Sequence, residues 1–214
     1  MSVSLKTGAE PFRSGSQVLQ ATVFDYWRWS GSDLMSNRER SILGEFLVAT
    51  ALGLEKEPRI EWNAYDLKSG DLKIEIKTSS AKQSWSQSKP SPIRFDIAPK
   101  SYGWDEETDT TDVGVKRRAD VYVFCELHGD DPLDTDGWTF YVVSTAVLNQ
   151  RLPHQKSIGV KPLMDLHPTV STYADLKKSI ETVNDSPASQ VSVEPHHSPP
   201  AHLTPVPVSP PAKN

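Results

Sequence analysis

The sequence predicts an α/β or α+β domain, in which helices flank a central mixed β-sheet. Helical and strand-like hydrophobic periods alternate between Ser14 and Val183. Residues 121–125 and 138–143 are apolar on both faces, as are central strands of a covered sheet. The chain of 214 residues, 36% of them hydrophobic, is long enough for one domain with a substantial core.

The N-terminal part is predicted to be flexible at first and then helical. Residues 1–13 have no periodic pattern, and the aromatic-rich residues 22–30 are expected to form a short helix. Ser36 and Glu39 have the spacing of a capping box, so a longer helix should begin there. Gly53 is suited to end it, because glycine readily adopts the left-handed conformation found after helices.

A β-hairpin is predicted next, from residues 61–67 and 72–77, with a turn around Ser69–Gly70. The second strand alternates apolar and charged residues, which is the pattern of a half-buried strand. The remaining predicted elements, in chain order, are strands over residues 93–97, 121–125 and 138–143 and helices over residues 145–151 and 172–183.

Residues 185–214 are predicted to form a disordered, extended tail. They contain eight of the 17 prolines and lack aromatic residues, so they cannot bury enough apolar surface to offset the entropy of ordering. The expected organisation is therefore a flexible segment 1–13, one domain 14–184 and the tail 185–214. Proline-rich segments favour the polyproline conformation, and the tail is expected to recruit a protein partner if it has a role.

Composition excludes several classes of protein. One cysteine leaves no intrachain disulfide framework and no cysteine-based zinc site. The first residues are polar rather than signal-peptide-like, and no run of about 18 apolar residues occurs, so a soluble cytoplasmic protein without a membrane span is expected. The net charge of −5 argues against a surface that is basic throughout, but it permits a local basic patch that binds nucleic acid.

The predicted hairpin brings two carboxylates together. A two-residue turn at Ser69–Gly70 pairs Asp66 with Lys73, the neighbour of Glu75, whereas a four-residue turn pairs Asp66 with Glu75 itself. Lys77 lies two positions beyond Glu75, on the same face of the strand. Both registers thus place two acids and one lysine close to each other.

Such a trio suits metal-assisted hydrolysis. Neighbouring carboxylates repel unless a cation lies between them, and Mg²⁺ prefers oxygen ligands. A bound metal activates water and stabilises charge on a phosphoryl oxygen. Lys77 would then orient or deprotonate the water, or neutralise the transition state. The alternative is an ordinary solvated strand face, where acids and lysines alternating with isoleucines are common.

Glu45 adds a third acid. It is the only ionisable residue in the apolar stretch from Ser41 to Leu54, so it is either buried at a high energetic cost or directed at a cation. The alternative is a position on the helix flank, from which the carboxylate reaches water. Gly44 lowers helix propensity beside it, which indicates that another chain segment passes close to the helix.

Three acids and a lysine in the order helix, strand, strand resemble the motif of the PD-(D/E)xK nuclease superfamily. The resemblance is carried by Gly44–Glu45, Asp66 and Glu75–Ile76–Lys77. It implies the restriction-endonuclease-like fold, with Glu45, Asp66 and Glu75 as ligands of Mg²⁺, for which Mn²⁺ may substitute. It also implies that Asp66, Glu75 and Lys77 are catalytic and that the lysine serves the attacking water.

Two positions extend or depart from that resemblance. Tyr65 stands where the family name has proline, a frequent departure. Several branches of the superfamily carry a glutamine after the lysine of the E-x-K element, and Gln83 could correspond to it. The resemblance covers residues 36–97, less than a third of the chain.

A locally basic stretch surrounds these residues. Residues 68–100 hold seven lysines and arginines and three acids, together with many serine and glutamine donors. A solvated polar loop is the alternative. The predicted nucleic-acid-binding residues are Lys73, Lys82, Gln83, Lys116, Arg117 and Arg118.

The sequence thus favours a Mg²⁺-dependent nuclease that hydrolyses phosphodiester bonds in DNA. A catalytically silent DNA-binding or assembly subunit of the same fold is the alternative, and an interaction protein with coincidental charges is a third. A homodimer is left open, because a single nuclease domain of this size often needs a second copy to cut both strands of a duplex.

Overall fold

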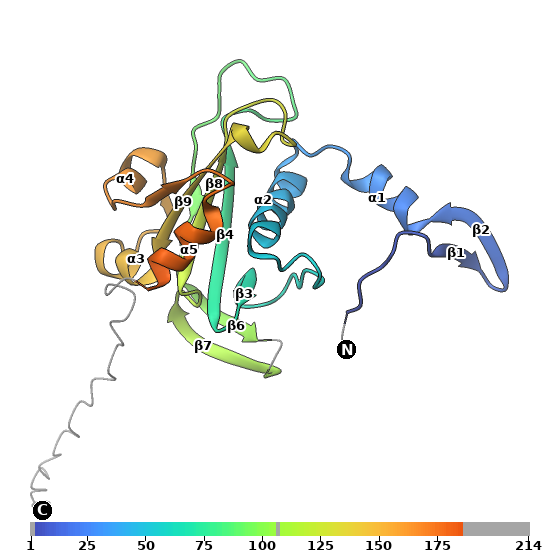
Figure 1. Cartoon of the computed structure of the whole chain (residues 1–214), viewed down its shortest axis with the longest axis horizontal. Coiled ribbons are helices and arrows are strands. Elements are labelled where there is room, and N and C mark those ends of the chain that lie inside the picture. The colour runs from blue at the N-terminus through green and yellow to red at the C-terminus, as the bar shows by residue number, and fades with distance from the viewer. Residues whose placement is uncertain (1–2, 106–107, 186–214) are drawn as a thin grey trace, which may run out of the picture.

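The computed structural model describes residues 3–105 and 108–185. Its centre is a five-stranded mixed sheet in the order β11-β9-β8-β4-β3, with helices packed against it (Figure 1). The mixed α/β class predicted from the sequence is therefore confirmed. The predicted tail lies outside the described residues except for Asp185.

The elements have the following bounds. The helices are α1 (Val23–Gly31), α2 (Asn37–Leu52), α3 (Thr145–Arg151), α4 (Val160–Met164) and α5 (Leu176–Asn184). The strands are β1 (Pro11–Ser14), β2 (Gln17–Thr22), β3 (Leu67–Ser69), β4 (Leu72–Ser80), β5 (Phe95–Asp96), β6 (Lys100–Asp105), β7 (Thr110–Lys116), β8 (Val121–Leu127), β9 (Trp138–Ser144), β10 (Ser157–Ile158) and β11 (Thr169–Ser171).

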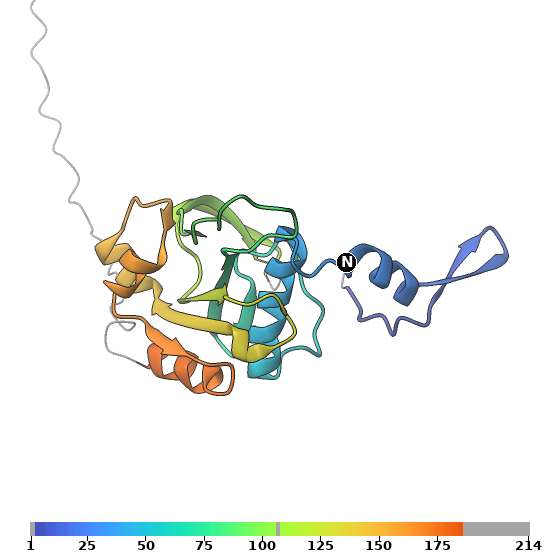
Figure 2. The ribbon, with the colours of Figure 1, turned by 90° about the horizontal axis from the view of Figure 1, so that it is seen from above.

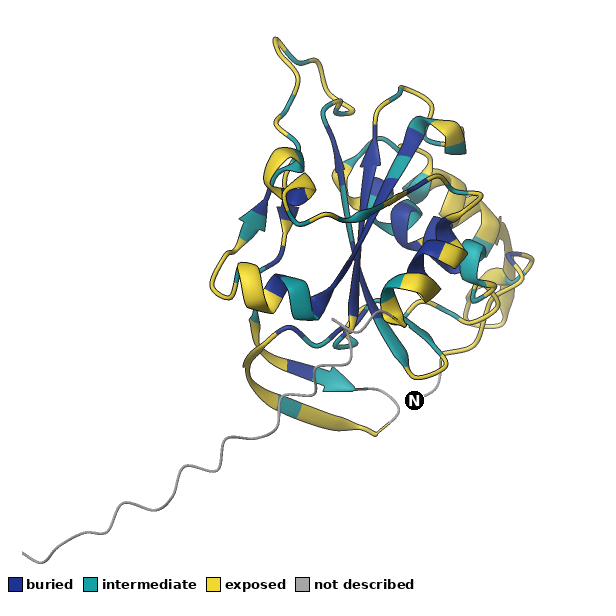
Figure 3. Ribbon diagram, turned by 60° about the vertical axis from the view of Figure 1, so that its left-hand side comes forward, coloured by how far each residue is buried: buried dark blue, intermediate teal, exposed yellow. Residues whose placement is uncertain are grey.

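Strand β8 is the centre of the sheet, as its apolar sequence predicts. It pairs in parallel with β4 and antiparallel with β9, and all seven of its residues are buried (Figure 3). The other pairs in this sheet, β3 with β4 and β9 with β11, are antiparallel. Helices cover the sheet on both faces, so the middle strands need apolar side chains on both sides.

Two apolar clusters stabilise the domain. In one, Val48 of α2 and Ile180 of α5 pack with Ile74 of β4 and other strand residues. In the other, Phe124 of β8 packs with side chains that include Leu148 of α3. All five side chains are fully buried, and burial of each such side chain contributes about 1.5–3 kcal/mol.

Helix α2 begins and ends where the sequence predicts. The Ser36 hydroxyl accepts a hydrogen bond from the Glu39 backbone N–H at 3.3 Å, which caps the first turn. Gly53 follows the helix with a left-handed φ of 74°, and its N–H donates to the last turn. The Glu39 carboxylate pairs with Arg38 at 2.7 Å, rather than completing the predicted capping box.

The close passage expected at Gly44 is also present. A Cβ atom at this position would lie 2.1 Å from the Thr78 Oγ1 atom of β4, well inside van der Waals contact. Glycine therefore lets α2 approach the sheet next to Glu45, and this close packing fixes the height of the Glu45 side chain above β4.

We expect Gly44→Ala to lower the free energy of unfolding by about 1–3 kcal/mol, because the added methyl group overpacks a buried contact. Chemical denaturation of the purified variant measures this change. Adding Thr78→Ala should recover part of the loss, and Gly31→Ala, whose Cβ would be 3.4 Å from the nearest atom, should stay within about 0.5 kcal/mol of wild type. Alanine stabilises a helix at a position with open space around it. A Gly44→Ala variant more stable than wild type would therefore contradict the close contact between α2 and β4.

Several predicted elements differ from those observed. The strand predicted over residues 61–67 is reduced to β3, because the chain before Leu67 runs through turns with one isolated bridge between Asn63 and Trp104. The strand predicted over residues 93–97 is the short β5, which pairs with β10. Helix α5 begins at Leu176 rather than at residue 172, and the β6–β7 hairpin was not predicted.

Within residues 3–31, an N-terminal arm projects from the body of the domain (Figures 1 and 2). The arm consists of the β1–β2 hairpin and α1, so strand structure begins at Pro11, within the segment predicted to be flexible. The predicted helix is confirmed, and Thr22 caps it. No residue of α1 is buried, and Trp29 is 85% exposed.

Among residues 3–105 and 108–185, no helix has the length and apolar character needed to cross a membrane.

Candidate functional site

The β3–β4 hairpin sets the position of the predicted acids. Ser69 pairs with Leu72, which leaves Gly70 and Asp71 as a two-residue turn, and Gly70 adopts a φ of 60°. This register, continued by one residue, sets Asp66 opposite Glu75. Of the two predicted registers, the one that pairs the acids is therefore present, although its turn is shorter than predicted.

Asp66 lies where β3 leaves the ladder, and its side chain is fixed there. Its backbone N–H donates to the Ile74 carbonyl at 3.0 Å, and its Oδ2 atom accepts from the Ile76 N–H at 2.6 Å. The carboxylate thus takes the place of a neighbouring strand's carbonyl at the edge of β4. A side chain held in this way has little freedom to turn toward solvent.

Glu75 is buried in the middle of β4, with only 3% of its surface exposed. Two ammonium groups contact the same oxygen: Lys77 Nζ lies 2.6 Å from Glu75 Oε1, and Lys100 Nζ lies 3.1 Å from it. Lys77 shares the strand face of Glu75, as the alternation predicts, whereas Lys100 begins β6. The burial of Glu75 contradicts the alternative of an ordinary solvated strand face.

Glu45 is also buried, and it faces a cation. Arg59, from the connection between α2 and β3, binds both carboxylate oxygens, with Nη2 at 3.1 Å from Oε1 and Nε against Oε2. The alternative in which Glu45 lies on the flank of the helix and reaches water is therefore wrong. The sequence analysis missed Arg59; the only signal is that it is the single arginine between α2 and β4.

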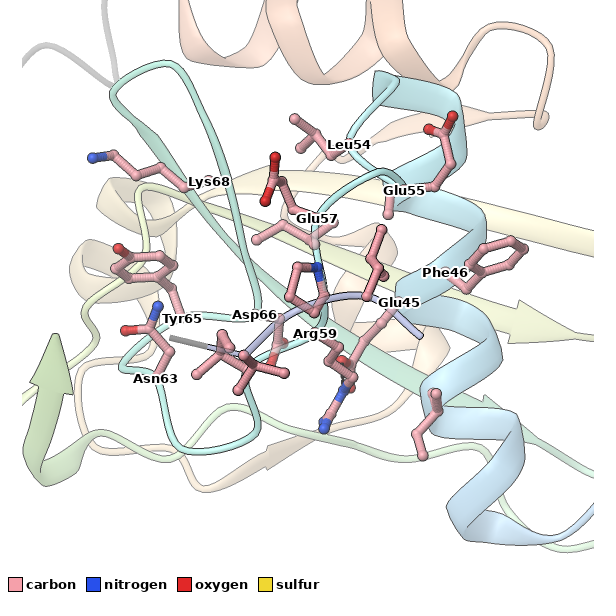
Figure 4. A pocket seen from close by; sticks show the side chains of 17 residues that line it. Glu45, Phe46, Leu54, Glu55, Glu57, Arg59, Asn63, Tyr65, Asp66 and Lys68 are labelled. Carbon is pink, nitrogen blue, oxygen red and sulfur yellow. Dashed lines mark hydrogen bonds and ion pairs between the residues drawn. The ribbon is translucent and has the colours of Figure 1, made fainter. Parts of the chain in front are cut away.

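These groups border a cavity of about 640 Å³ (Figure 4). Figure 4 shows Glu45 and Arg59 together on one side of the cavity and Asp66 near them. Glu75 borders a separate, smaller cleft of about 10 Å³, which Lys100 and Tyr122 also line. The acids thus lie at the meeting point of α2, β3 and β4 but open onto two hollows.

The charges of Glu75 and Glu45 affect the pKa of Asp66. Burial, the nearby Glu75 carboxylate and Glu45 together raise the pKa of Asp66 to about 7, although the Lys77 ammonium and the Ile76 N–H act in the opposite direction. Burial alone would lower the pKa of Lys77, but Glu75 and Asp66 outweigh this effect and raise it. Lys77 is therefore an ammonium at neutral pH, whereas Asp66 exchanges its proton near pH 7.

The donor set fits a hard divalent cation in chemistry but not as a ready-made triad. Within the described parts of the chain, no group of three or more His, Cys, Asp or Glu side chains is arranged to hold a metal ion. Arg59 binds both oxygens of Glu45, the Ile76 N–H binds Asp66 Oδ2, and two lysines bind Glu75 Oε1, so the three acids do not form a preformed triad. The assignment of Glu45, Asp66 and Glu75 as metal ligands stays a prediction. The raised pKa of Asp66 still marks an excess of buried carboxylate, which a divalent cation would relieve.

Four of the predicted nucleic-acid-binding residues have polar partners within the fold. Lys73 Nζ lies 3.1 Å from Asp105 and 4.9 Å from the centre of the Tyr65 ring. Lys116 lies 2.7 Å from Asp112, and Lys82 pairs with Asp130. The Gln83 amide donates to the Ser80 carbonyl at 2.9 Å and accepts from Arg40 at 3.3 Å, beyond the end of β4.

The other two, Arg117 and Arg118, are structural in this fold. The buried Arg117 guanidinium donates to the Ile97 and Leu152 carbonyls, each at 2.9 Å, and to Asn149 at 2.8 Å. Arg118, whose side chain is 6% exposed, donates to carbonyl groups of both strands of the β6–β7 hairpin. Most of their donors thus bind backbone carbonyls, and the others bind the Asn149 and Asp112 side chains. Their predicted role in nucleic-acid binding stays a prediction.

Comparison with known proteins gives no relative from which a role could be transferred. A scan against protein-family models finds no match to the chain, and neither does a search of curated proteins. The chemistry of Glu45, Asp66, Glu75 and Lys77 is therefore the basis for a function.

Proposed function

We propose that the chain is a Mg²⁺-dependent nuclease that hydrolyses phosphodiester bonds in DNA, with a restriction-endonuclease-like core of the PD-(D/E)xK type. The observation that carries the proposal is the buried Glu75 carboxylate with the half-buried Asp66 and Lys77 beside it where β3 meets β4, together with Glu45 of α2, which helps to raise the pKa of Asp66. Burial of Glu45 and Glu75 and partial burial of Asp66 are costly, and clustered buried acids with a shifted pKa are typical of functional sites.

The order of elements supports the same proposal. A helix that contributes Glu45 precedes the hairpin that contributes Asp66 and Glu75, and β4 then pairs in parallel with the central strand β8. In the proposed site, Glu45, Asp66 and Glu75 would hold Mg²⁺ or Mn²⁺. The metal would supply a more acidic water and Lewis-acid stabilisation of the phosphoryl oxygen.

The protonation states assign a role to Lys77. Because the pKa of Lys77 is raised and its side chain is an ammonium, it is a poor base but a good electrostatic partner. Lys77 would therefore orient the attacking water and stabilise negative charge that develops on the phosphate. Asp66 must lose its proton to act as a ligand, and a pKa of about 7 permits this at the upper end of the neutral range.

The alternative, a catalytically silent DNA-binding or assembly subunit, is favoured by one observation. Arg59 binds both oxygens of Glu45, and such a two-pronged pair is among the stronger ion pairs in proteins. If Arg59 holds Glu45 permanently, one of the three proposed ligands is lost.

A cleavage assay separates these alternatives. We expect the purified full-length protein to cut DNA with Mg²⁺ or Mn²⁺ and to stop when EDTA is added, in parallel reactions on duplex DNA, single-stranded DNA and RNA. Binding of DNA without cleavage under any of these conditions would support the silent subunit. Cleavage of RNA but not DNA would show that the substrate is RNA. Absence of both binding and cleavage would contradict the proposed function.

A further inference from the structure

We infer that Lys100 is a phosphate-binding residue that neutralises Glu75 until a metal ion binds. This inference rests on the proposed nuclease function, because it assigns a substrate contact to the same site. In the metal-free protein, the Lys100 ammonium binds Glu75. When Glu75 turns to the metal, Lys100 is released and binds a phosphate of the nucleic acid next to the scissile bond.

The contact geometry supports this role. Lys77 and Lys100 both contact Glu75 Oε1, at 2.6 Å and 3.1 Å, so a single carboxylate oxygen serves two cations. A metal ion that binds Glu75 through Oε1 would compete with both contacts. One of the two lysines therefore becomes available when Oε1 acts as a ligand.

Exposure decides which lysine is released. The Lys77 side chain is 21% exposed and is also coupled to Asp66, whereas the Lys100 side chain is 57% exposed. An ion pair formed by an exposed lysine is weak, because water screens it and the flexible side chain loses entropy. Lys100 is thus the contact that is easily displaced, and its ammonium group is the one that a large substrate can reach.

The backbone of Lys100 is held in place while more than half of its side chain is exposed. The Lys100 carbonyl accepts a hydrogen bond from Arg118 Nη1 at 2.9 Å, and Lys100 pairs with Lys116 at the base of the β6–β7 hairpin. The small cleft of about 10 Å³ beside Glu75 lies between these residues and Tyr122 and offers room for about one water molecule or phosphate oxygen. A fixed backbone that carries an exposed ammonium group is suited to bind a phosphate.

Lys116 provides a matched control within the same cleft. Its side chain is 53% exposed, close to the exposure of Lys100, and the two residues are cross-strand partners. Its ammonium pairs with Asp112 of β7, at 2.7 Å, instead of with Glu75. Removing the Lys116 charge should therefore leave the Glu75 carboxylate unchanged.

The test compares Lys100→Gln with Lys116→Gln in the full-length protein. Calorimetric titration with Mn²⁺ alone should show about two- to fivefold tighter binding for Lys100→Gln, because a competing cation is gone, and no change for Lys116→Gln. DNA binding in Ca²⁺, measured over a range of salt concentrations, should be about five- to tenfold weaker for Lys100→Gln. The slope of log affinity against log salt should fall in magnitude by about one.

Lys100→Arg should keep DNA affinity within about twofold of wild type, because it retains the charge, and this variant separates loss of charge from local unfolding. If the wild-type protein binds Mn²⁺ and cuts DNA, and Lys100→Gln has the same affinities for Mn²⁺ and for DNA, the role of Lys100 is wrong. The proposed nuclease function would not be contradicted by that result. Tighter Mn²⁺ binding with unchanged DNA binding would overturn the phosphate contact. Wild-type protein without Mn²⁺ binding or cleavage would overturn both.

Discussion

Asp66→Ala and Glu75→Ala should each lower the rate of DNA cleavage by at least about 100-fold, the scale on which loss of one group that stabilises the transition state acts. Each substitution would remove one of the oxygen ligands proposed to hold the metal where β3 meets β4. Lys77→Ala should lose activity to a similar extent but retain metal binding, because its ammonium contacts Glu75 rather than a metal. Initial rates of plasmid cleavage in Mg²⁺, together with Mn²⁺ titrations, measure both effects.

Asp71→Ala is the appropriate control, because Asp71 is an exposed acid in the turn of the same hairpin. It should cut DNA at close to the wild-type rate. Circular dichroism and thermal melting of each variant separate a lost ligand from a lost fold. If all three site variants cut at the wild-type rate, the site is assigned to the wrong residues, and if they unfold, the charges serve the structure instead.

Asp66→Asn should make the metal-free protein more stable at pH 8, while it abolishes activity. Burial and the Glu75 carboxylate raise the pKa of Asp66 to about 7 in the folded protein, from an ordinary value of 3.8. The corresponding free-energy difference is at most about 4 kcal/mol. Asparagine carries no charge at any pH and keeps an oxygen that can accept the Ile76 N–H.

The sign of the pH dependence follows from the same pKa values. Between about pH 4 and pH 7 the folded state retains a proton on Asp66 that the unfolded state releases, so the contribution of this group to wild-type stability falls as pH rises through that window. The gain from Asp66→Asn should therefore be larger at pH 8 than at pH 5.

Urea denaturation in EDTA at both pH values measures the gain, with Asp71→Asn as the control for a general charge effect. An Asp66→Asn variant that is less stable than wild type at pH 8 would show that the ionised carboxylate stabilises the fold. A gain of equal size at both pH values would rule out titration of Asp66 as its cause.

The local part of the candidate site is predictable from the sequence. The alternation of residues 72–77 indicates a strand that presents Glu75 and Lys77 on one face, and the lone acid in an apolar helix indicates that Glu45 is buried or directed at a cation. These inferences succeed because strand and helix periods determine which side chains share a face. The resemblance to a nuclease motif adds roles for these residues, and those roles stay predictions.

The partners of these acids could not be predicted, because they come from distant parts of the chain. Arg59 reaches Glu45 from a connection without periodic structure, and Lys100 reaches Glu75 from a hairpin that was not predicted. Arg117 was assigned to a basic surface, but carbonyl groups from residues far along the chain enclose it. Backbone carbonyls have no residue-specific signature, so the sequence does not distinguish an arginine that binds them from one that binds phosphate.

The parallel pairing of β4 with β8 also determines when a growing polypeptide can acquire the site. Glu75 lies opposite Tyr122, and the segments that form β5, β6 and β7 are synthesised between the two strands. Parallel strands require such a long crossover, and contacts between distant residues form late. On the ribosome, Asp66 and Glu75 would thus emerge into water, and only a chain that extends through β8 could enclose them. Under the proposed function, the nuclease site would therefore be assembled only after β8 has been synthesised.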